Sequence, residues 1–401
     1  MTGPVTGACR QTENTIVTTK FITNRNVSHQ HDPDKRVQVI WSLNLLVSRY
    51  QSLFSTEGYV LTNRIGLMGF GRIGRNVFRL LVDHPHLEVA AISDIVDPTG
   101  LTYLLKYDSI YGRFPRPVSY ADGTMQMEDR KIAFLTAKEP QEVPWKSLGV
   151  DLVVDSTGKY RTAEGTQAHL DAGAKRVVVA STPEKPGEVP VLLRGINDGV
   201  LTPSTQAIAL GSNTSNAVAP ILRILDNALG IDRVFFTTVH AMTNDQRLAD
   251  VPGTDFRTSR AAGENIIPAE TNSPEILAQV MPELAGRIQA MALNVPVADG
   301  STVDLTAIVA QPTSREAVNA AVAAAASGRF NGVIEFTADP IVSSDVRSST
   351  YSGVFDSLST MVMEETMVKT ITWFNNGWGY SARIVEVLEQ MAIHLAAGGG
   401  R

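Results

Sequence analysis

The stretch GFGRIG at residues 69–74 decides the fold of this chain, because it has the pattern G-x-G-x-x-G. Residues 64–70, up to its first glycines, are apolar as in a short buried strand, and residues 75–84 have helical spacing. In this context the glycines permit a tight turn, a close approach of the backbone to a pyrophosphate, and close packing of helix on strand. The predicted cofactor-binding residues of this stretch are Gly69, Gly71, Arg72, Ile73 and Gly74.

A carboxylate at the required distance supports a dinucleotide site. Asp94 lies twenty residues after Gly74, at the end of the next apolar segment, 87–94. There it can accept hydrogen bonds from the adenosine ribose hydroxyls, and it would repel a 2′-phosphate. NAD is therefore predicted rather than NADP. A glycine turn in a Rossmann-like domain without a nucleotide is the less favoured alternative.

Further apolar segments alternate with helical ones over residues 63–210. Residues 151–157 and 176–182 have the composition of buried strands, and residues 101–107 have that of a helix. Near-continuous apolar strands separated by helices are typical of a parallel sheet covered on both faces. We predict an α/β fold class, with a doubly wound Rossmann domain over these residues.

From residue 211 the pattern changes to that of an α+β domain, predicted over residues 211–375. A helical stripe follows residue 216, a strand is predicted at 233–242, and a long loop from Thr243 to Pro268. Strands are predicted around 290–310 and an alanine-rich helix at 314–328. Thr313 and Glu316 have the spacing of a capping box for that helix.

The composition excludes several classes of protein. The chain has 401 residues, 43% of them hydrophobic, and a net charge of −6, which disfavours binding to nucleic acid or to an anionic membrane. No apolar run reaches the roughly 20 residues of a membrane-spanning helix. The seven histidines show no metal-ligand spacing, so no metal site is predicted.

Residues 1–62 differ from the rest of the chain because they are polar and only weakly periodic. We predict a poorly ordered N-terminal extension, with residues 37–50 as a segment that could dock it. A wrongly chosen start codon is an open alternative. The single cysteine, Cys9, lies in this stretch, where a reactive role is not expected.

Several longer segments in the right order resemble the glyceraldehyde-3-phosphate dehydrogenase family. They include GFGRIGRNVFRLL, LLKYDSIYGRF (104–114), DSTGKYRT (155–162), TTVHAMTNDQRLAD (237–250), SRAAGENIIP (259–268) and NNGWGYSARIVE (375–386). The resemblance extends from about residue 64 to 395. It implies an NAD-binding Rossmann domain, a catalytic domain, and a C-terminal segment (376–401) whose helix returns to the first domain.

The resemblance also implies an activity and an assembly. Members of the family oxidise an aldehyde through a cysteine thiolate, pass hydride to NAD and release the thioester with phosphate. A homotetramer with an S-shaped loop at residues 243–268, a cytoplasmic location and a role in carbohydrate metabolism are implied as well. No nucleic-acid or membrane partner is expected.

Site residues are carried over position by position. His240 matches the catalytic histidine, and Thr243 and Arg260 match the pair that binds the substrate phosphate. The second anion site is matched by Ser212, Thr214 and Thr271. The nicotinamide side of the cofactor is matched by Thr157, Gly158, Asn376 and Tyr380. A structural salt bridge is the alternative interpretation of Arg260.

The nucleophile of the family is missing. Where the family has S-C-T-T-N-C, residues 212–217 read SNTSNA, so Asn213 occupies the cysteine position. Smaller departures are Met68, Asn272 and Gly377. A carboxamide nitrogen is not a nucleophile at neutral pH, so the phosphorylating thioester mechanism is predicted to be absent.

Three hypotheses follow for Asn213. It can be a helix N-cap in a catalytically silent NAD-binding homologue that regulates, or assembles with, an active paralogue. It can instead donate a hydrogen bond to a carbonyl oxygen while His240 acts as general acid or base. The chain would then be an NAD-dependent oxidoreductase for a small anionic substrate, expected to be phosphorylated. A sequence error at the cysteine is the third and least favoured hypothesis.

Overall fold

The computed structural model describes residues 62–253 and 255–398. All of them lie within one compact unit, Leu61–Arg401. The predictions for residues 1–61, Cys9 and the segment 37–50 included, lie outside the described residues. Among the helices described, none is long and apolar enough to cross a membrane.

The first sheet has eight strands in the order β10-β9-β8-β1-β2-β7-β6-β5. Neighbouring strands from β10 to β7 run parallel, and the last two pairs are antiparallel. Its strands are β1 (Asn63–Met68), β2 (Leu87–Ser93), β5 (Val118–Ala121), β6 (Thr124–Met127), β7 (Arg130–Leu135), β8 (Leu152–Asp155), β9 (Arg176–Val179) and β10 (Ala207–Ala209). The predicted parallel α/β sheet is therefore confirmed, with an antiparallel edge added to it.

Helices follow three of the parallel strands of this sheet, β1, β2 and β8. They are α2 (Arg72–Leu81), α3 (Pro98–Lys106) and α4 (Ala163–Asp171). Smaller elements of the described chain are β3 (Tyr107–Asp108), β4 (Gly112–Arg113), η2 (Pro140–Glu142), η3 (Asp198–Val200), η4 (Pro282–Leu284) and η5 (Ser343–Val346). Each strand-to-helix turn leaves at the carboxyl edge of the parallel strands, where ligands bind in such sheets.

The glycines of the fingerprint have the conformations that the motif predicts. Gly69 has φ +90°, and a Cβ there would lie 2.9 Å from the backbone of Ser156 and of Thr157. A Cβ on Gly74 would lie 2.2 Å from the carbonyl oxygen of Gly69. A Cβ on Gly71 would have no described atom within 4 Å. The turn thus requires a glycine at position 69, and close packing requires one at position 74. Gly71 leaves its backbone accessible to a ligand.

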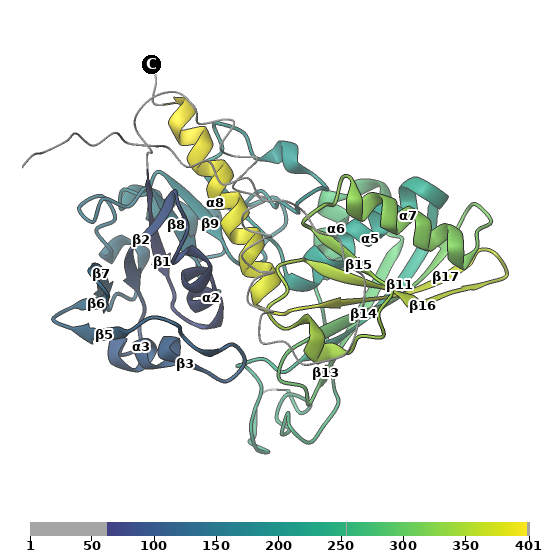
Figure 1. The fold of residues 1–401 in the computed structure, drawn as a ribbon, viewed down its shortest axis with the longest axis horizontal. Coiled ribbons are helices and arrows are strands. Elements are labelled where there is room, and N and C mark those ends of the chain that lie inside the picture. The colour runs from purple at the N-terminus through teal and green to yellow at the C-terminus, as the bar shows by residue number, and fades with distance from the viewer. Residues whose placement is uncertain (1–61, 254, 399–401) are drawn as a thin grey trace, which may run out of the picture. The chain divides into compact units, whose positions relative to one another are not determined.

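The second sheet has seven strands in the order β12-β13-β11-β14-β17-β16-β15. They are β11 (Ile231–Ala241), β12 (Ile267–Ala269), β13 (Ile288–Val295), β14 (Ser301–Val309), β15 (Ile334–Thr337), β16 (Gly353–Met363) and β17 (Met367–Phe374). Parallel and antiparallel pairs are mixed, as expected for the predicted α+β part. Helices α5 (Asn213–Leu229), α6 (Ser273–Val280) and α7 (Arg315–Ser327) pack on this sheet (Figure 1).

The cap predicted for α7 is wrong by one residue. The N-cap is Ser314, whose side chain accepts a hydrogen bond from the N–H of Ala317 at 3.2 Å. Thr313 is one residue too early to reach the first turn. Both residues can cap a helix, so composition alone did not distinguish them.

The last helix, α8 (Trp378–Gly398), joins the core of the first sheet. Its apolar side chains, among them Ile384, Leu388 and Met391, share a buried cluster with Val77 and Leu81 of α2. Figure 1 shows α8, in yellow, beside α2. The chain therefore leaves the second sheet at Phe374 and contributes the start of α8 to the functional site described below.

Candidate functional site

Four elements bring predicted site residues together. Asn213 is the first residue of α5, His240 lies near the end of β11, and Asn376 lies between β17 and α8. A residue that sequence analysis missed, Ser301, is the first of β14. Because β14 is the sheet neighbour of both β11 and β17, its first residue lies between His240 and Asn376.

Three of these side chains are linked through Ala241. The N–H of Ala241 donates to Ser301 Oγ at 2.9 Å, and that hydroxyl donates to Asn376 Oδ1 at 2.8 Å. The Nδ2 of Asn376 lies 3.2 Å from both ring nitrogens of His240. His240 Nδ1 lies 2.7 Å from the carbonyl oxygen of Ala241.

The bond to Ala241 determines which nitrogen of His240 carries the proton. A carbonyl oxygen can only accept, so Nδ1 must donate to Ala241. Nε2 then holds the lone pair. Burial lowers the pKa of the imidazole, partly opposed by the Ala241 carbonyl, and the charge of Arg72 lowers it further. His240 is therefore a neutral base at pH 7, with its lone pair on Nε2.

The predicted N-cap role of Asn213 is wrong, because Ser212 caps α5. The hydroxyl of Ser212 accepts a hydrogen bond from the N–H of Ser215 at 3.0 Å. The N–H of Ser212 in turn donates to Oγ of Ser215. Asn213 Oδ1 accepts from the N–H of Thr214 at 2.7 Å, and its Nδ2 donates to the carbonyl oxygen of Asn376 at 2.9 Å. Asn213 thus ties α5 to the start of α8 and keeps one amide N–H without a bond in the described chain.

A chain of hydroxyls connects two of the predicted anion-binding residues. Thr271 donates to Ser273 Oγ at 3.0 Å, and Ser273 Oγ lies 3.5 Å from Ser212 Oγ. Ser273 is fully buried and was missed by sequence analysis, since a serine at the start of a helix has an ordinary capping role. The third predicted residue, Thr214, is buried with its hydroxyl 3.5 Å from Asn213 Oδ1.

Thr243 and Arg260, the predicted phosphate-binding pair, each have another partner in the structure. Arg260 Nε lies 3.0 Å from Asp250 Oδ2, and both side chains are more than half exposed. Thr243 instead donates its N–H to the side chain of Gln246 at 3.0 Å. The salt-bridge alternative for Arg260 therefore matches the structure. A backbone bridge between Arg247 and Ala261 closes this loop. It brings Arg260 close to Asp250, which lies ten residues earlier in the sequence.

On the adenosine side, Asp94 supports the fingerprint turn. Its Oδ2 accepts from the N–H of Phe70 at 2.6 Å and its Oδ1 from the N–H of Val96 at 3.0 Å. A carboxylate accepts about four hydrogen bonds. Asp94 thus retains acceptor capacity for ribose hydroxyls next to Gly71 and the half-buried Ile73.

On the nicotinamide side, a buried chain of side chains holds Thr157. Trp145 Nε1 donates to His169 Nδ1 at 3.2 Å, and His169 Nε2 lies 3.0 Å from Asp155 Oδ2. The other oxygen of Asp155 accepts from the N–H and the hydroxyl of Thr157 at 2.9 and 2.6 Å. A helical histidine and a strand-end aspartate carry no sequence signal of this pairing. The next residue, Gly158, has φ +70° and open space at its Cβ position.

Tyr380 has a supporting position rather than an exposed one. It is buried in the first core, and its hydroxyl donates to the carbonyl oxygen of Gly211 at 2.8 Å. Burial raises the pKa of that hydroxyl far above its usual value. Tyr380 therefore fixes the start of α8 against the residue before the Ser212 cap.

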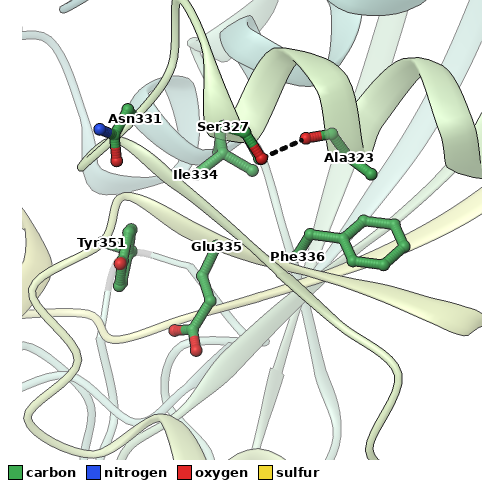
Figure 2. A pocket seen from close by; sticks show the side chains of 8 residues that line it. Ala323, Ser327, Asn331, Ile334, Glu335, Phe336 and Tyr351 are labelled. Atoms are coloured by element: carbon green, nitrogen blue, oxygen red, sulfur yellow. Dashed lines mark hydrogen bonds between the residues drawn. The ribbon is translucent and has the colours of Figure 1, made fainter. Parts of the chain in front are cut away.

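A hollow of about 500 Å³ lies elsewhere, beside α7 and β15. Figure 2 shows Glu335 and Tyr351 among its lining residues, and the hydroxyl of Ser327 donates to the carbonyl oxygen of Ala323 at 3.0 Å. None of the predicted site residues lines it. Among the described residues, no group of three or more His, Cys, Asp or Glu side chains could hold a metal ion.

The glycine fingerprint, the strand-end aspartate and the neutral histidine together define a nicotinamide-dinucleotide oxidoreductase. Two family models match the chain. The one described as glyceraldehyde 3-phosphate dehydrogenase, NAD binding domain, matches residues 63–163, and the one for the C-terminal domain matches residues 212–376. The chain belongs to the glyceraldehyde-3-phosphate dehydrogenase family, with NAD as its cofactor.

Individual relatives agree with this assignment. The chain is 41% identical over 330 residues to a glyceraldehyde-3-phosphate dehydrogenase of Geobacillus stearothermophilus, covering 82% of this chain and 98% of the relative. It is 43% identical over 335 residues to one of Mycobacterium avium, with the same coverage. A third, of Thermotoga maritima, is 42% identical over 328 residues, covering 81% of this chain and 98% of the relative.

Proposed function

We propose that this protein transfers hydride between NAD and an alcohol or oxo carbon of a small anionic substrate without a covalent thioester. The observation that carries the proposal is a neutral His240, with its lone pair on Nε2, and the amide of Asn213, both in contact with Asn376. A general base must be neutral and placed near the proton that it takes. Burial supplies the first condition, since it lowers the pKa of His240.

The chemistry balances without a nucleophile. In the oxidative direction, His240 Nε2 takes the proton of a substrate hydroxyl while the C–H hydride passes to NAD⁺, which leaves a carbonyl compound, NADH and a protonated imidazole. The same steps on a hydrated aldehyde give a carboxylic acid. The remaining amide N–H of Asn213 donates a hydrogen bond to the oxygen on which negative charge develops. When bound, NAD supplies the hydride acceptor, and Asp94, Thr157 and Gly71 are the residues proposed to hold it.

The absence of a phosphorylating step is part of this proposal. Asn213 is held by two hydrogen bonds, and a carboxamide cannot form an acyl intermediate that phosphate would release. The position of this residue at the start of α5 supports its correspondence with the family's nucleophile. We propose that the charged group of the substrate binds near the start of α5 or near the glycine fingerprint.

One observation favours the alternative of a catalytically silent NAD-binding homologue. The Nδ2 of Asn376 covers both ring nitrogens of His240, and its Oδ1 accepts from Ser301. A substrate hydroxyl must displace the Asn376 amide from Nε2 before proton transfer. If it cannot, the protein binds NAD and serves a regulatory or co-assembly role.

We further propose that the protein assembles into a homotetramer, or with an active paralogue. The face of the second sheet opposite α5 and α7 carries exposed apolar side chains. Phe235 of β11 is 67% exposed, and Met361 of β16 lies in the same row across the sheet. An uncovered apolar sheet face is a common protein interface. A cytoplasmic location and a role in carbohydrate metabolism are proposed from the family alone.

The test is a screen of hydride transfer with the purified protein. Small hydroxy and oxo compounds, charged and neutral, are supplied with NAD⁺ or NADH, and absorbance of NADH is followed. Wild type is expected to turn over at least one charged compound, and His240→Asn is expected to lose this activity by 100-fold or more, as for a general base. Binding of NAD without turnover of any compound would support the silent alternative.

A further inference from the structure

The hollow beside α7 and β15 follows the free edge of a sheet. Three consecutive residues of β15 line it, Ile334, Glu335 and Phe336, together with Asn331 before this strand and Tyr351 before β16. Consecutive side chains of a strand point to opposite faces. A hollow that touches all three therefore runs along the outer side of β15, which is the last strand of the second sheet.

A buried arginine holds the two loops of this hollow in place. Arg383 of α8 donates to the carbonyl oxygen of Gly332 at 2.9 Å and to that of Thr350 at 3.2 Å. These residues are the direct neighbours of Asn331 and Tyr351. One guanidinium thus ties together the backbones that carry two of the polar lining residues, so the hollow is formed before any ligand binds.

The charge of the hollow is negative and unmatched. The carboxylate of Glu335 forms no hydrogen bond or ion pair within the described part of the chain, and the charge of Arg383 is already paired with Glu386. Glu335 is open to the hollow, yet the surrounding protein removes enough water to raise the pKa of its carboxyl group. The last turn of α7, which ends at Ser327, adds the partial negative charge of a helix C-terminus.

Oxygen acceptors and apolar walls complete the hollow. The hydroxyl of Tyr351 and the side-chain amide of Asn331 also lack a hydrogen bond among the residues described, and Figure 2 shows Tyr351 between Asn331 and Glu335. An ammonium group has three N–H donors and no acceptor. The carboxylate, the phenol oxygen and the amide oxygen offer one acceptor to each donor. Ile334 and Phe336 add apolar surface for a hydrocarbon chain.

We propose that this hollow binds a small organic cation, a primary ammonium group on a short alkyl chain. The ammonium group lies between Glu335 and Tyr351, and the alkyl chain lies along Ile334 and Phe336. The volume of about 500 Å³ falls within the range of about 300–1,000 Å³ that is usual for small-molecule sites. None of the residues proposed to bind NAD or substrate lines it, so this inference goes beyond the proposed function and does not depend on it.

Calorimetric titration of the full chain with 1,5-diaminopentane tests the proposal. The uncharged analogue is 1,5-pentanediol, which has the same length and hydroxyl groups in place of the ammonium groups. Wild type is expected to bind the diamine at least about tenfold more tightly than the diol. Glu335→Gln is expected to weaken diamine binding by about tenfold or more, and Tyr351→Phe by less, because it removes one neutral acceptor.

Glu316→Gln is the matched control, since it removes an exposed carboxylate from the first turn of α7, at the other end of the helix. The proposal is overturned if wild type shows no saturable binding of the diamine, if the diol binds as tightly, or if Glu316→Gln causes the same loss as Glu335→Gln. The comparison of the two ligands on wild type requires no variant, so it stays decisive if a variant fails to fold.

A lysine-containing peptide, titrated in the same way, separates a small ligand from a protein partner. Binding of the diamine with no gain in affinity for the peptide supports the proposal. Peptide binding that is lost in Glu335→Gln, in a protein that does not bind the diamine, overturns it, because the occupant of the hollow would then be a protein segment.

Discussion

Nδ2 of Asn376 lies 3.2 Å from both ring nitrogens of His240, so this amide covers the base that the proposed reaction requires. Nδ1 donates to the carbonyl oxygen of Ala241, which leaves the lone pair on Nε2, and burial keeps the imidazole neutral. Catalysis requires a substrate hydroxyl to replace that amide. The contact also connects the second sheet to the helix that joins the NAD-binding part.

The pH dependence of oxidation should report the lowered pKa of His240. Its folded pKa lies below the ordinary value of 6.5 because of burial, so the neutral base persists below pH 6.5. We expect the acid limb of kcat/KM for oxidation to have its midpoint below 6.5, and His240→Asn to remove that limb. A midpoint above 6.5, measured by kinetics or by NMR titration of the ring, would contradict the assigned environment.

The same pKa predicts a stability effect. Because folding lowers the pKa of His240, protonation favours the unfolded chain. The free energy of unfolding should be unaffected by this group well above pH 6.5 and should fall as the pH drops below 6.5. Urea unfolding of wild type and His240→Asn at pH 8 and pH 5.5 measures it. A wild-type loss at low pH no larger than that of the variant would refute the prediction.

Replacing Asn376 by Asp should reverse the shift of the histidine pKa. A carboxylate 3.2 Å from the imidazole stabilises its protonated form, so the pKa of His240 should rise above its wild-type value. Oxidation at pH 7 should then slow while its optimum moves to higher pH. Asn376→Gln keeps the amide and is the matched control. An unchanged pH profile in Asn376→Asp would show that the contact does not persist in solution.

Ser212, and not Asn213, should carry the capping energy of α5. Ser212→Ala is expected to lower the free energy of unfolding by about 1 kcal/mol, because the N–H of Ser215 loses its acceptor. Asn213→Ala loses the bond to Asn376, and its effect on unfolding should be smaller. Chemical denaturation of both variants measures the difference. If Asn213→Ala lowered the free energy of unfolding more than Ser212→Ala does, Asn213 would be the capping residue.

The buried chain behind Thr157 should couple stability to NAD affinity. His169→Leu leaves Oδ2 of Asp155 and the indole N–H of Trp145 without a partner. We expect the free energy of unfolding to fall by about 1–3 kcal/mol and the dissociation constant for NAD to rise. Thr157→Val should weaken NAD binding with a smaller cost in stability. NAD affinity that is unchanged in both variants would exclude a positioning role.

The exposed sheet face should be the site of self-association. Phe235→Lys combined with Met361→Lys replaces two exposed apolar side chains of one row across the sheet by charged ones, and the assembly is expected to dissociate. Glu316→Lys, exposed on α7 over the other face, is the control. Light scattering after size-exclusion chromatography measures the mass. A double variant with the mass of wild type would place the interface elsewhere.

Much of the fold follows from local sequence patterns. The glycine fingerprint, the apolar strands and the stripe of α5 predicted their elements because burial and backbone conformation depend on neighbouring residues. The edge strands β5, β6 and β7 were not predicted, since short and half-exposed strands have weak periodicity. The errors at Ser314 and Ser212 arose where two capping residues stand side by side and only geometry selects one.

The site was less predictable because its contacts join distant segments. The motif containing His240 placed the histidine, but nothing in the sequence pairs it with Ser301, sixty-one residues later, through Asn376. The exposed charge of Arg260 matched an anion site by resemblance, whereas the structure pairs it with Asp250.

The most direct test of the central claim is phosphate-dependent NADH formation from glyceraldehyde 3-phosphate and NAD⁺. Wild type is compared with Asn213→Cys, which places a thiol at the start of α5 near His240. The account predicts that wild type forms no NADH in a phosphate-dependent manner and that the variant gains this activity. Phosphate-dependent turnover by wild type would contradict it, because a nucleophile other than residue 213 would then exist.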